Sequence, residues 1–77
     1  MSEFQRLTEK FKISVADFGI MSSLDLGESA TLSNGAKAEA WPSRRWDGMD
    51  EYWVSIQIQP KGSGPYEYAT DFYKYKG

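Results

Sequence analysis

The 77-residue sequence contains no cysteine and no histidine. Without cysteine there is no disulfide framework, and without either residue type there is no Cys/His zinc site. An imidazole base and a thiolate nucleophile, the commonest groups of acid–base and nucleophilic catalysis, are also missing. We therefore expect a protein that is not an enzyme and that uses neither a cofactor nor a metal ion.

The sequence also has no large excess of positive or negative charge. Nine Lys and Arg residues are interspersed with eleven Asp and Glu residues, for a formal net charge of −2. Such a mixture creates no cationic field to attract nucleic acid or an anionic membrane. Residues 1–10 lack the basic and then apolar pattern of a secretory signal, and no apolar run approaches the length of a membrane span. We expect a cytoplasmic protein without membrane contact.

Aromatic residues, by contrast, make up 16% of the chain, and every Trp and Tyr follows position 40. Large rings bury about 150–250 Å² each, which compensates for the small core of a short chain. The uneven distribution predicts one small α+β domain over residues 1–77. One or two N-terminal helices, about 2–25, would pack on a three- to four-stranded antiparallel sheet, about 29–76.

The N-terminal segment has the pattern of an amphipathic helix. Ser2 is a suitable N-cap, and Phe4, Leu7 and Phe11 recur at spacings of three and four residues. This stripe predicts a helix of about three turns with its apolar side on a sheet.

Residues 13–26 are compatible with two structures. Ile13 and Val15 fit a short strand, whereas Ser14 and Asp17 have the spacing of a capping box. The capping box favours a second short helix.

The second half of the chain has the pattern of β-strands. Asn34-Gly35 between two extended runs predicts a two-residue type I′ hairpin turn. Residues 52–59 alternate cleanly between apolar and polar, which is typical of a half-buried antiparallel strand. Residues 66–75 alternate until Phe72 and Tyr73, where we expect a β-bulge. Tyr66, Tyr68, Thr70 and Phe72 would then share one face.

The alternation of residues 52–59 places Trp53 on the polar face of the sheet, away from the helices. After a bulge, Tyr73 or Tyr75 of the last strand could share that face. An exposed aromatic patch of this kind usually marks a binding surface.

Residues 38–56 contain all three tryptophans and two adjacent arginines. Rigid rings and guanidinium groups dominate binding hot spots, so this stretch is the candidate site. The partner-binding candidates are Trp41, Arg44, Arg45, Trp46, Trp53 and Tyr73. Alternatively, Trp41 and Trp53 cap the ends of the sheet core, and the arginines pair with the nearby acids Asp47, Asp50 and Glu51.

Two functions follow from these residues. The leading hypothesis is a non-enzymatic protein-binding or regulatory module that contacts another protein or its own copy. From protein type alone, we hypothesise an accessory product of a phage or mobile element. The alternative is a module for single-stranded nucleic acid, with bases stacked on Trp46, Trp53 and Tyr73. Arg44, Arg45, Lys74 and Lys76 would then contact phosphates. The acids beside nearly every basic residue disfavour this alternative.

Overall fold

The computed structural model describes residues 3–44, 50–62 and 64–75. The elements in chain order are α1 (Glu3–Phe11), α2 (Val15–Ser23), β1 (Ser29–Thr31), β2 (Lys37–Pro42), β3 (Glu51–Gln59) and β4 (Glu67–Tyr75). Two helices thus precede four strands, which confirms the predicted α+β arrangement. The ambiguous segment after residue 13 contains a helix.

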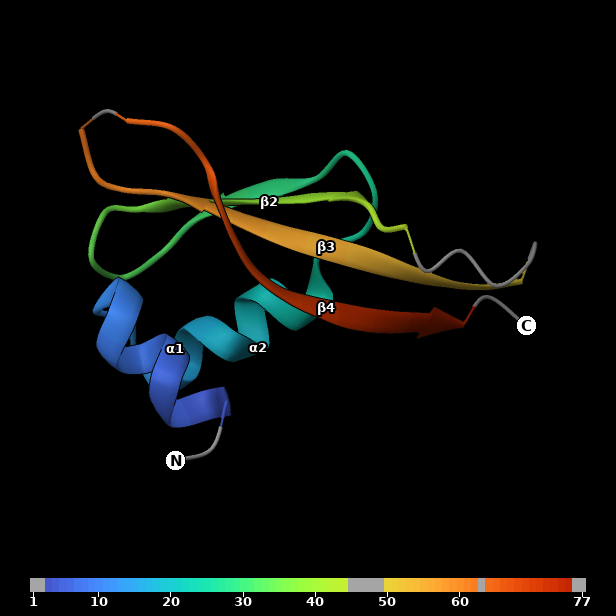
Figure 1. The fold of residues 1–77 in the computed structure, drawn as a ribbon, viewed down its shortest axis with the longest axis horizontal. Coiled ribbons are helices and arrows are strands. Elements are labelled where there is room, and N and C mark those ends of the chain that lie inside the picture. The colour runs from blue at the N-terminus through green and yellow to red at the C-terminus, as the bar shows by residue number, and fades with distance from the viewer. Residues whose placement is uncertain (1–2, 45–49, 63, 76–77) are drawn as a thin grey trace.

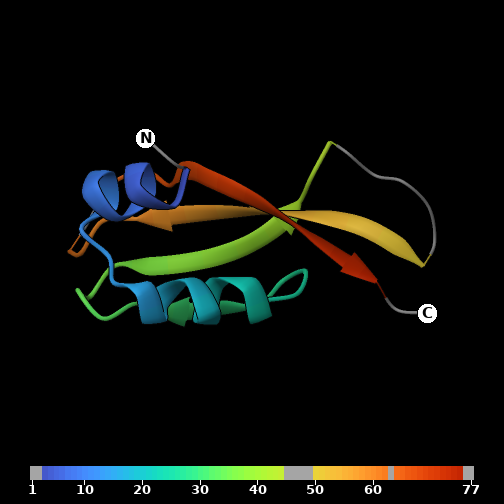
Figure 2. The same cartoon turned by 90° about the horizontal axis from the view of Figure 1, so that it is seen from below.

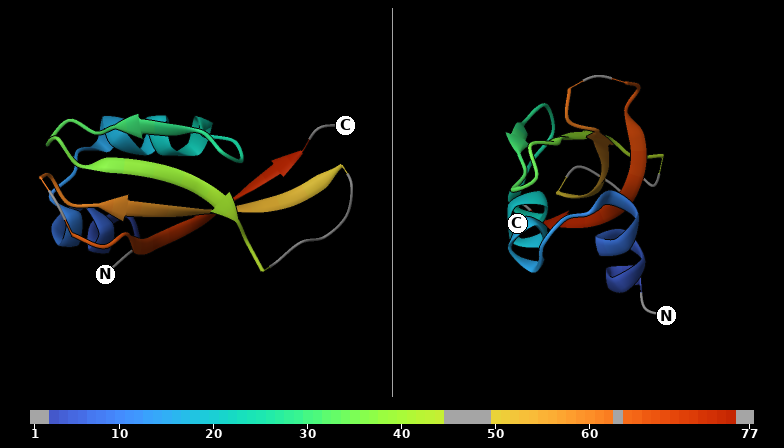
Figure 3. Two further views of the ribbon diagram at one scale, coloured as in Figure 1. Left: turned by 90° about the horizontal axis from the view of Figure 1, so that it is seen from above. Right: turned by 90° about the vertical axis from the view of Figure 1, so that its left-hand side faces the viewer.

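The four strands form one antiparallel sheet in the order β1-β2-β3-β4, so each strand pairs with its neighbour in the chain (Figure 1). Strand β3 is paired along both of its edges. Figure 2 shows both helices on one side of the sheet, and from above the strands lie in front of them (Figure 3). We call the side toward the helices the inner face and the other side the outer face.

The inner face of β3 forms the centre of the core. Its core residues, all buried, are Tyr52, Val54, Ile56 and Ile58. Next to them on β2, Ala38 pairs with Ile58 and Ala40 pairs with Ile56. These two small buried side chains allow α2 to approach β2 closely. Leu7 of α1 and Met21 of α2 complete the core from the helical layer.

The apolar stripe of α1 faces the core for most of its length. Leu7 is 1% exposed, and Phe11 is partly buried against the core, as the spacing predicts. Phe4 differs, because it stays exposed and stacks on Phe18 of α2 with ring centroids 4.5 Å apart. The first turn of α1 therefore packs on the neighbouring helix. The predicted N-cap, Ser2, lies outside the described residues.

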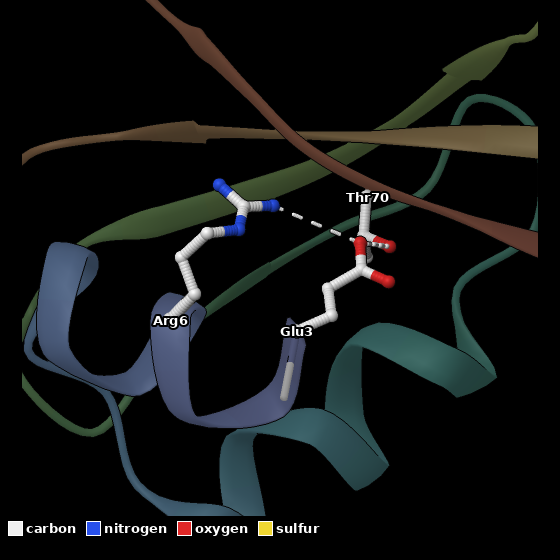
Figure 4. A network of polar contacts seen from close by, with 3 residues as sticks. All are labelled: Glu3, Arg6 and Thr70. Carbon is white, nitrogen blue, oxygen red and sulfur yellow. Dashed lines mark hydrogen bonds and ion pairs between the residues drawn. The ribbon is translucent and has the colours of Figure 1, made fainter. Parts of the chain in front are cut away.

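A polar contact joins the first turn of α1 to β4 (Figure 4). The Thr70 hydroxyl donates to the Glu3 carboxylate at 2.9 Å, and Arg6 forms an ion pair with the same carboxylate at 3.8 Å. The ion pair is solvent-exposed, and such pairs contribute little to stability. The contact to Thr70 matters more for position, because it fixes the start of α1 beside the edge strand.

The start of α2 depends on a buried carboxylate, Asp17. It accepts hydrogen bonds from the Ser14 backbone N–H at 2.9 Å, the Ser33 backbone N–H at 3.0 Å and the Ser33 hydroxyl at 2.8 Å. Burial raises the pKa of Asp17, but the hydrogen bonds to its charged form outweigh burial and lower the pKa overall. Asp17 thus forms the predicted capping box and also attaches α2 to the turn between β1 and β2.

The predicted type I′ turn at Asn34-Gly35 is wrong. The Gly35 N–H donates to the Leu32 carbonyl at 3.0 Å, and the Leu32 N–H donates to the Ala36 carbonyl at 2.7 Å. The loop therefore has three residues, 33–35. In a type I′ turn both central residues have positive φ, but in this loop only Gly35 does, at 91°.

The reason for this turn lies at the end of α1. The Asn34 side-chain amide donates to the carbonyls of Phe11 at 2.9 Å and Lys12 at 3.1 Å. Its Oδ1 accepts from the Ala36 N–H at 2.9 Å. Asn34 thus provides hydrogen bonds to a helix terminus distant in sequence, a tertiary role that local turn preferences do not reveal.

The β-bulge of β4 lies earlier than predicted. The register of β4 against β3 shifts between Ile56, which pairs with Thr70, and Gln57, which pairs with Tyr68. Ala69 is left without an opposite residue, as in a β-bulge. Tyr68 therefore lies on the outer face and Thr70 on the inner face.

This position corrects two expectations about the last strand. Phe72 and Tyr73, where we expected the bulge, pair in regular register with Val54 and Trp53. Tyr66, Tyr68, Thr70 and Phe72 do not all share one face as expected. The extra residue at the bulge places Tyr68 on the outer face and Thr70 on the inner face.

Replacing Leu7 by Ala should lower the free energy of unfolding by about 2–5 kcal/mol, because it removes buried methyl groups and leaves a cavity. Urea unfolding followed by circular dichroism measures this change. The exposed Val15→Ala in α2 is the control and should change stability by less than about 0.5 kcal/mol. Equal effects of the two substitutions would show that α1 is not packed on the sheet.

Replacing Asp17 by Asn should lower the free energy of unfolding at neutral pH by about 1–3 kcal/mol, because buried donors lose a charged acceptor. The pKa of Asp17 is lowered in the folded state. Its stabilisation is therefore complete above the unfolded-state pKa, about 3.9, and is lost as the pH falls through the lower folded-state pKa.

Urea unfolding at several pH values tests this linkage. The difference between wild type and Asp17→Asn should shrink as the pH falls below about 4. Glu9→Gln, at an exposed position of α1, is the control. A difference that stays constant into strong acid would contradict a stabilising charge at Asp17.

Candidate functional site

The outer face carries aromatic and polar side chains across β2, β3 and β4. One row consists of Trp41, Ser55 and Asp71, which the register places side by side. The adjacent row consists of Glu39, Gln57 and Tyr68. Both described helices lie on the inner side (Figure 2). The outer face is therefore the broad surface that the described helices leave uncovered.

A groove of about 500 Å³ lies over β3 on this face. Its floor includes Ser55 and Gln57, each only 9% exposed although no described helix covers them. Trp41 from β2 and Tyr68 from β4, 40% and 52% exposed, flank that floor. The Gln57 side-chain amide donates to the Ser55 hydroxyl at 2.7 Å. The result is a polar floor between two aromatic walls.

Charged groups of both signs also line the groove. Arg44 follows the end of β2, and Asp71 lies on β4 beside Ser55. A groove with one guanidinium group and one carboxylate suits a ligand that has both hydrogen-bond donors and acceptors. Among the lining residues that the structure describes, cations are not in the excess that a polyanion requires.

Glu39 holds the wall residue Trp41 in place. Its carboxylate accepts from the Trp41 indole N–H at 2.8 Å and from the Tyr66 hydroxyl at 2.6 Å. The rings of Trp41 and Tyr66 lie 5.6 Å apart. These hydrogen bonds, first that of Tyr66, lower the pKa of Glu39, and the same contact raises the pKa of Tyr66. The Trp41 wall is therefore oriented by a carboxylate that is charged at neutral pH.

A second aromatic pair lies farther along β3. Trp53 and Tyr73 pair across the strands, and their rings meet edge-to-face with centroids 5.3 Å apart. Trp53 is half-buried and Tyr73 is exposed. The alternation of residues 52–59 thus predicts the face of Trp53. Of the two expected neighbours, Tyr73 and Tyr75, the register pairs Tyr73 with Trp53, although the bulge lies elsewhere than expected.

The structure brings together some of the predicted site residues and not others. Trp41 and Arg44 line the groove, whereas Trp53 and Tyr73 form the separate pair. Arg45 and Trp46 lie outside the described residues, as does Asp47. Trp41 projects from the outer face, so it does not cap the inner core, contrary to the alternative interpretation.

The predicted candidates did not include the floor and wall residues Ser55, Gln57, Tyr68 and Asp71, or Glu39 and Tyr66, which orient Trp41. The simple alternation of the last strand assigns both tyrosines to the same face as Thr70, which is the inner face. The signal that could have found Tyr68 is the conflict within residues 66–75, where aromatic residues occupy both alternation phases. Such a conflict indicates a bulge but does not locate it.

The groove presents hydrogen-bonding groups, aromatic rings and charged side chains, which are the groups that bind a ligand non-covalently. Within the described ranges, no group of three or more His, Cys, Asp or Glu residues could hold a metal ion. Neither of the two described helices is long and apolar enough to span a membrane.

Comparison with known proteins does not assign a function, because no family model, no curated protein and no solved structure matches the chain.

A titration of the side-chain carboxyl carbons by NMR should give Glu39 a pKa below the ordinary value of about 4.3. Tyr66→Phe should raise this pKa, because it removes the hydrogen bond that contributes most to the charged form. Trp41→Phe should raise it by less. Val15→Ala on α2 is the control. An unchanged pKa in Tyr66→Phe would show that the hydrogen bond is absent in solution.

Proposed function

We propose that this chain is a small, non-enzymatic protein-binding module whose outer sheet face takes up an extended segment of another protein. The observation that carries the proposal is the groove between Trp41 and Tyr68, with Ser55 and Gln57 on its floor. The groove lies over β3, with one aromatic wall from β2 and the other from β4. Because both edges of β3 are already paired, we expect a peptide there to be held by its side chains and by the polar floor and not by strand addition.

The chemistry of the groove also suits a polypeptide. Aromatic rings and arginine are enriched in the centre of protein interfaces, and Trp41, Tyr68 and Arg44 supply them here. The side chains of Ser55 and Gln57 can exchange hydrogen bonds with peptide groups. Glu39 fixes the Trp41 ring before binding, which reduces the entropy lost on association.

Single-stranded nucleic acid is the second candidate, and the charges of the outer face disfavour it. Asp71 lines the groove, and Glu39 is held in its charged form beside it. Lys74, expected to contact phosphates, instead pairs with Tyr52 on the inner face and donates to the Ser22 carbonyl of α2. Counterion release needs a local excess of cations. Arg45, Trp46 and Lys76 lie outside the described residues.

The occupant of the groove is a segment of a different protein. A second copy of the chain is the alternative occupant, and sedimentation distinguishes the two. The origin in a phage or mobile element stays a prediction from protein type, and the geometry of the outer face does not bear on it.

A random peptide library should yield ligands for the wild-type protein that the double variant Trp41→Ala/Tyr68→Ala does not retain. We expect the selected peptides to bind the double variant at least about tenfold more weakly, as for the truncation of hot-spot rings. Calorimetry measures the affinities, and circular dichroism checks that the variant is folded. Val15→Ala, on the opposite side of the sheet, is the control and should bind normally.

NMR spectra then locate the peptide. Binding should shift the Trp41 indole N–H and the Gln57 side-chain amide signals. Three outcomes would count against the proposal: selected peptides that bind the double variant equally well, tight oligonucleotide binding that weakens steeply with salt, or a dimer in sedimentation that Trp41→Ala dissociates. The last two would favour nucleic acid and a second copy, respectively.

A further inference from the structure

A second cavity, of about 300 Å³, lies where the end of α1 approaches the sheet. Three segments distant in sequence meet there: the end of α1, the turn between β1 and β2, and the loop that follows β3 (Figures 1 and 3). The cavity contains three lysines, Lys10, Lys12 and Lys61. Apolar groups, including Phe11, Ile58 and Pro60, form much of the rest.

The charge of this cavity contrasts with that of the whole chain. Three lysines line it against one carboxylate, Glu67, in a sequence with a formal net charge of −2. Lys10 pairs with Glu67 at 2.9 Å. Within the described ranges, Lys12 and Lys61 have no ion-pair partner. Two positive charges thus remain uncompensated beside an apolar surface.

Lys61 is positioned by the turn between β1 and β2. Lys61 lies against the turn so closely that a Cβ on Gly35 would come within 2.8 Å of the Lys61 Cδ. The aliphatic stem of Lys61 is therefore packed on Gly35.

Lys12 ends α1 in the left-handed conformation, with φ of 58°. This position favours glycine, because a Cβ is strained there. The charge of Lys12 is favoured by the negative end of the helix dipole, while its Cβ is strained by the left-handed backbone. Lys12 also supplies an ammonium group to the lining of the cavity.

Asn34 reduces the repulsion that an anion would meet from the carbonyls at the end of α1. The C-terminus of a helix carries partial negative charge on its unpaired carbonyls. Here the Asn34 amide donates to the carbonyls of Phe11 and Lys12, at 2.9 and 3.1 Å. Those acceptors are thereby occupied on the side where the lysines lie.

We infer that this cavity binds a small organic phosphomonoester, with the phosphate between Lys12 and Lys61 and an apolar or aromatic body against Phe11 and Pro60. Two uncompensated ammonium groups match a group that carries about −1.5 to −2 charges at pH 7. A volume of about 300 Å³ lies at the lower end of the range of small-molecule sites. The site is distinct from the outer-face groove and does not depend on it.

Phenyl phosphate is the probe, with phenol and inorganic phosphate as its apolar and anionic halves. In NMR titrations, phenyl phosphate should shift the signals of Asn34, Gly35 and Ala36 and bind more tightly than either half. Lys61→Met keeps the unbranched stem and should weaken binding by roughly fivefold or more, since it removes a charge-assisted contact. Lys37→Gln is the matched control: it removes the same charge from nearby β2, outside the cavity lining, and should bind normally.

Lys12→Gly separates binding from folding. Glycine relieves the strain of the left-handed position, so the variant should melt at the same or a higher temperature while it binds phenyl phosphate roughly fivefold or more weakly. Equal weakening by Lys37→Gln, or full binding by Lys12→Gly, would overturn the inference. So would phosphate alone binding as tightly as phenyl phosphate, since the apolar surface would then have no role.

Discussion

The two-residue alternation of β3 is the constraint on which the rest of the structure depends. Both edges of this strand are paired, so its register is fixed against β2 and against β4. One face supplies Val54, Ile56 and Ile58 to the core, and the other supplies Ser55 and Gln57 to the groove. A shift of one residue in register would exchange the two sets. In a chain of 77 residues without disulfide bonds, the core could not tolerate that exchange, so core packing also fixes the floor of the groove.

The bulge at Ala69 determines what surrounds that floor. Without it, a continuous alternation would place Tyr68 on the same side as Thr70, beside α1. With it, the first part of β4 presents Tyr68 to the outer face, and the later part still presents Phe72 to the core. Bulges are common where a strand must redirect a side chain. One additional residue thus reconciles a packed inner face with an aromatic wall on the outer face.

The sequence predicts the elements that depend on neighbouring residues. The stripe around Leu7, the capping box of Asp17 and the alternation of residues 52–59 are all local patterns, and the structure confirms them. It does not predict features decided by distant residues. The turn at Asn34 depends on the carbonyls that end α1. The groove depends on a bulge whose position the aromatic residues of β4 leave open, because they occupy both phases of the alternation. Trp41 and Arg44 were therefore found as candidates, whereas Tyr66 and Tyr68 were not.

The groove and the lysine-lined cavity share one short segment of backbone. Tyr66 donates to Glu39, which orients the Trp41 wall, and the next residue, Glu67, pairs with Lys10 at the cavity. Adjacent residues of an extended chain project to opposite sides, so one segment can serve both sites. The Lys10–Glu67 ion pair ties residue 67 to α1, and the Tyr66–Glu39 hydrogen bond ties residue 66 to β2. Residues 66 and 67 are therefore held from both sides, which fixes the direction in which the chain enters β4.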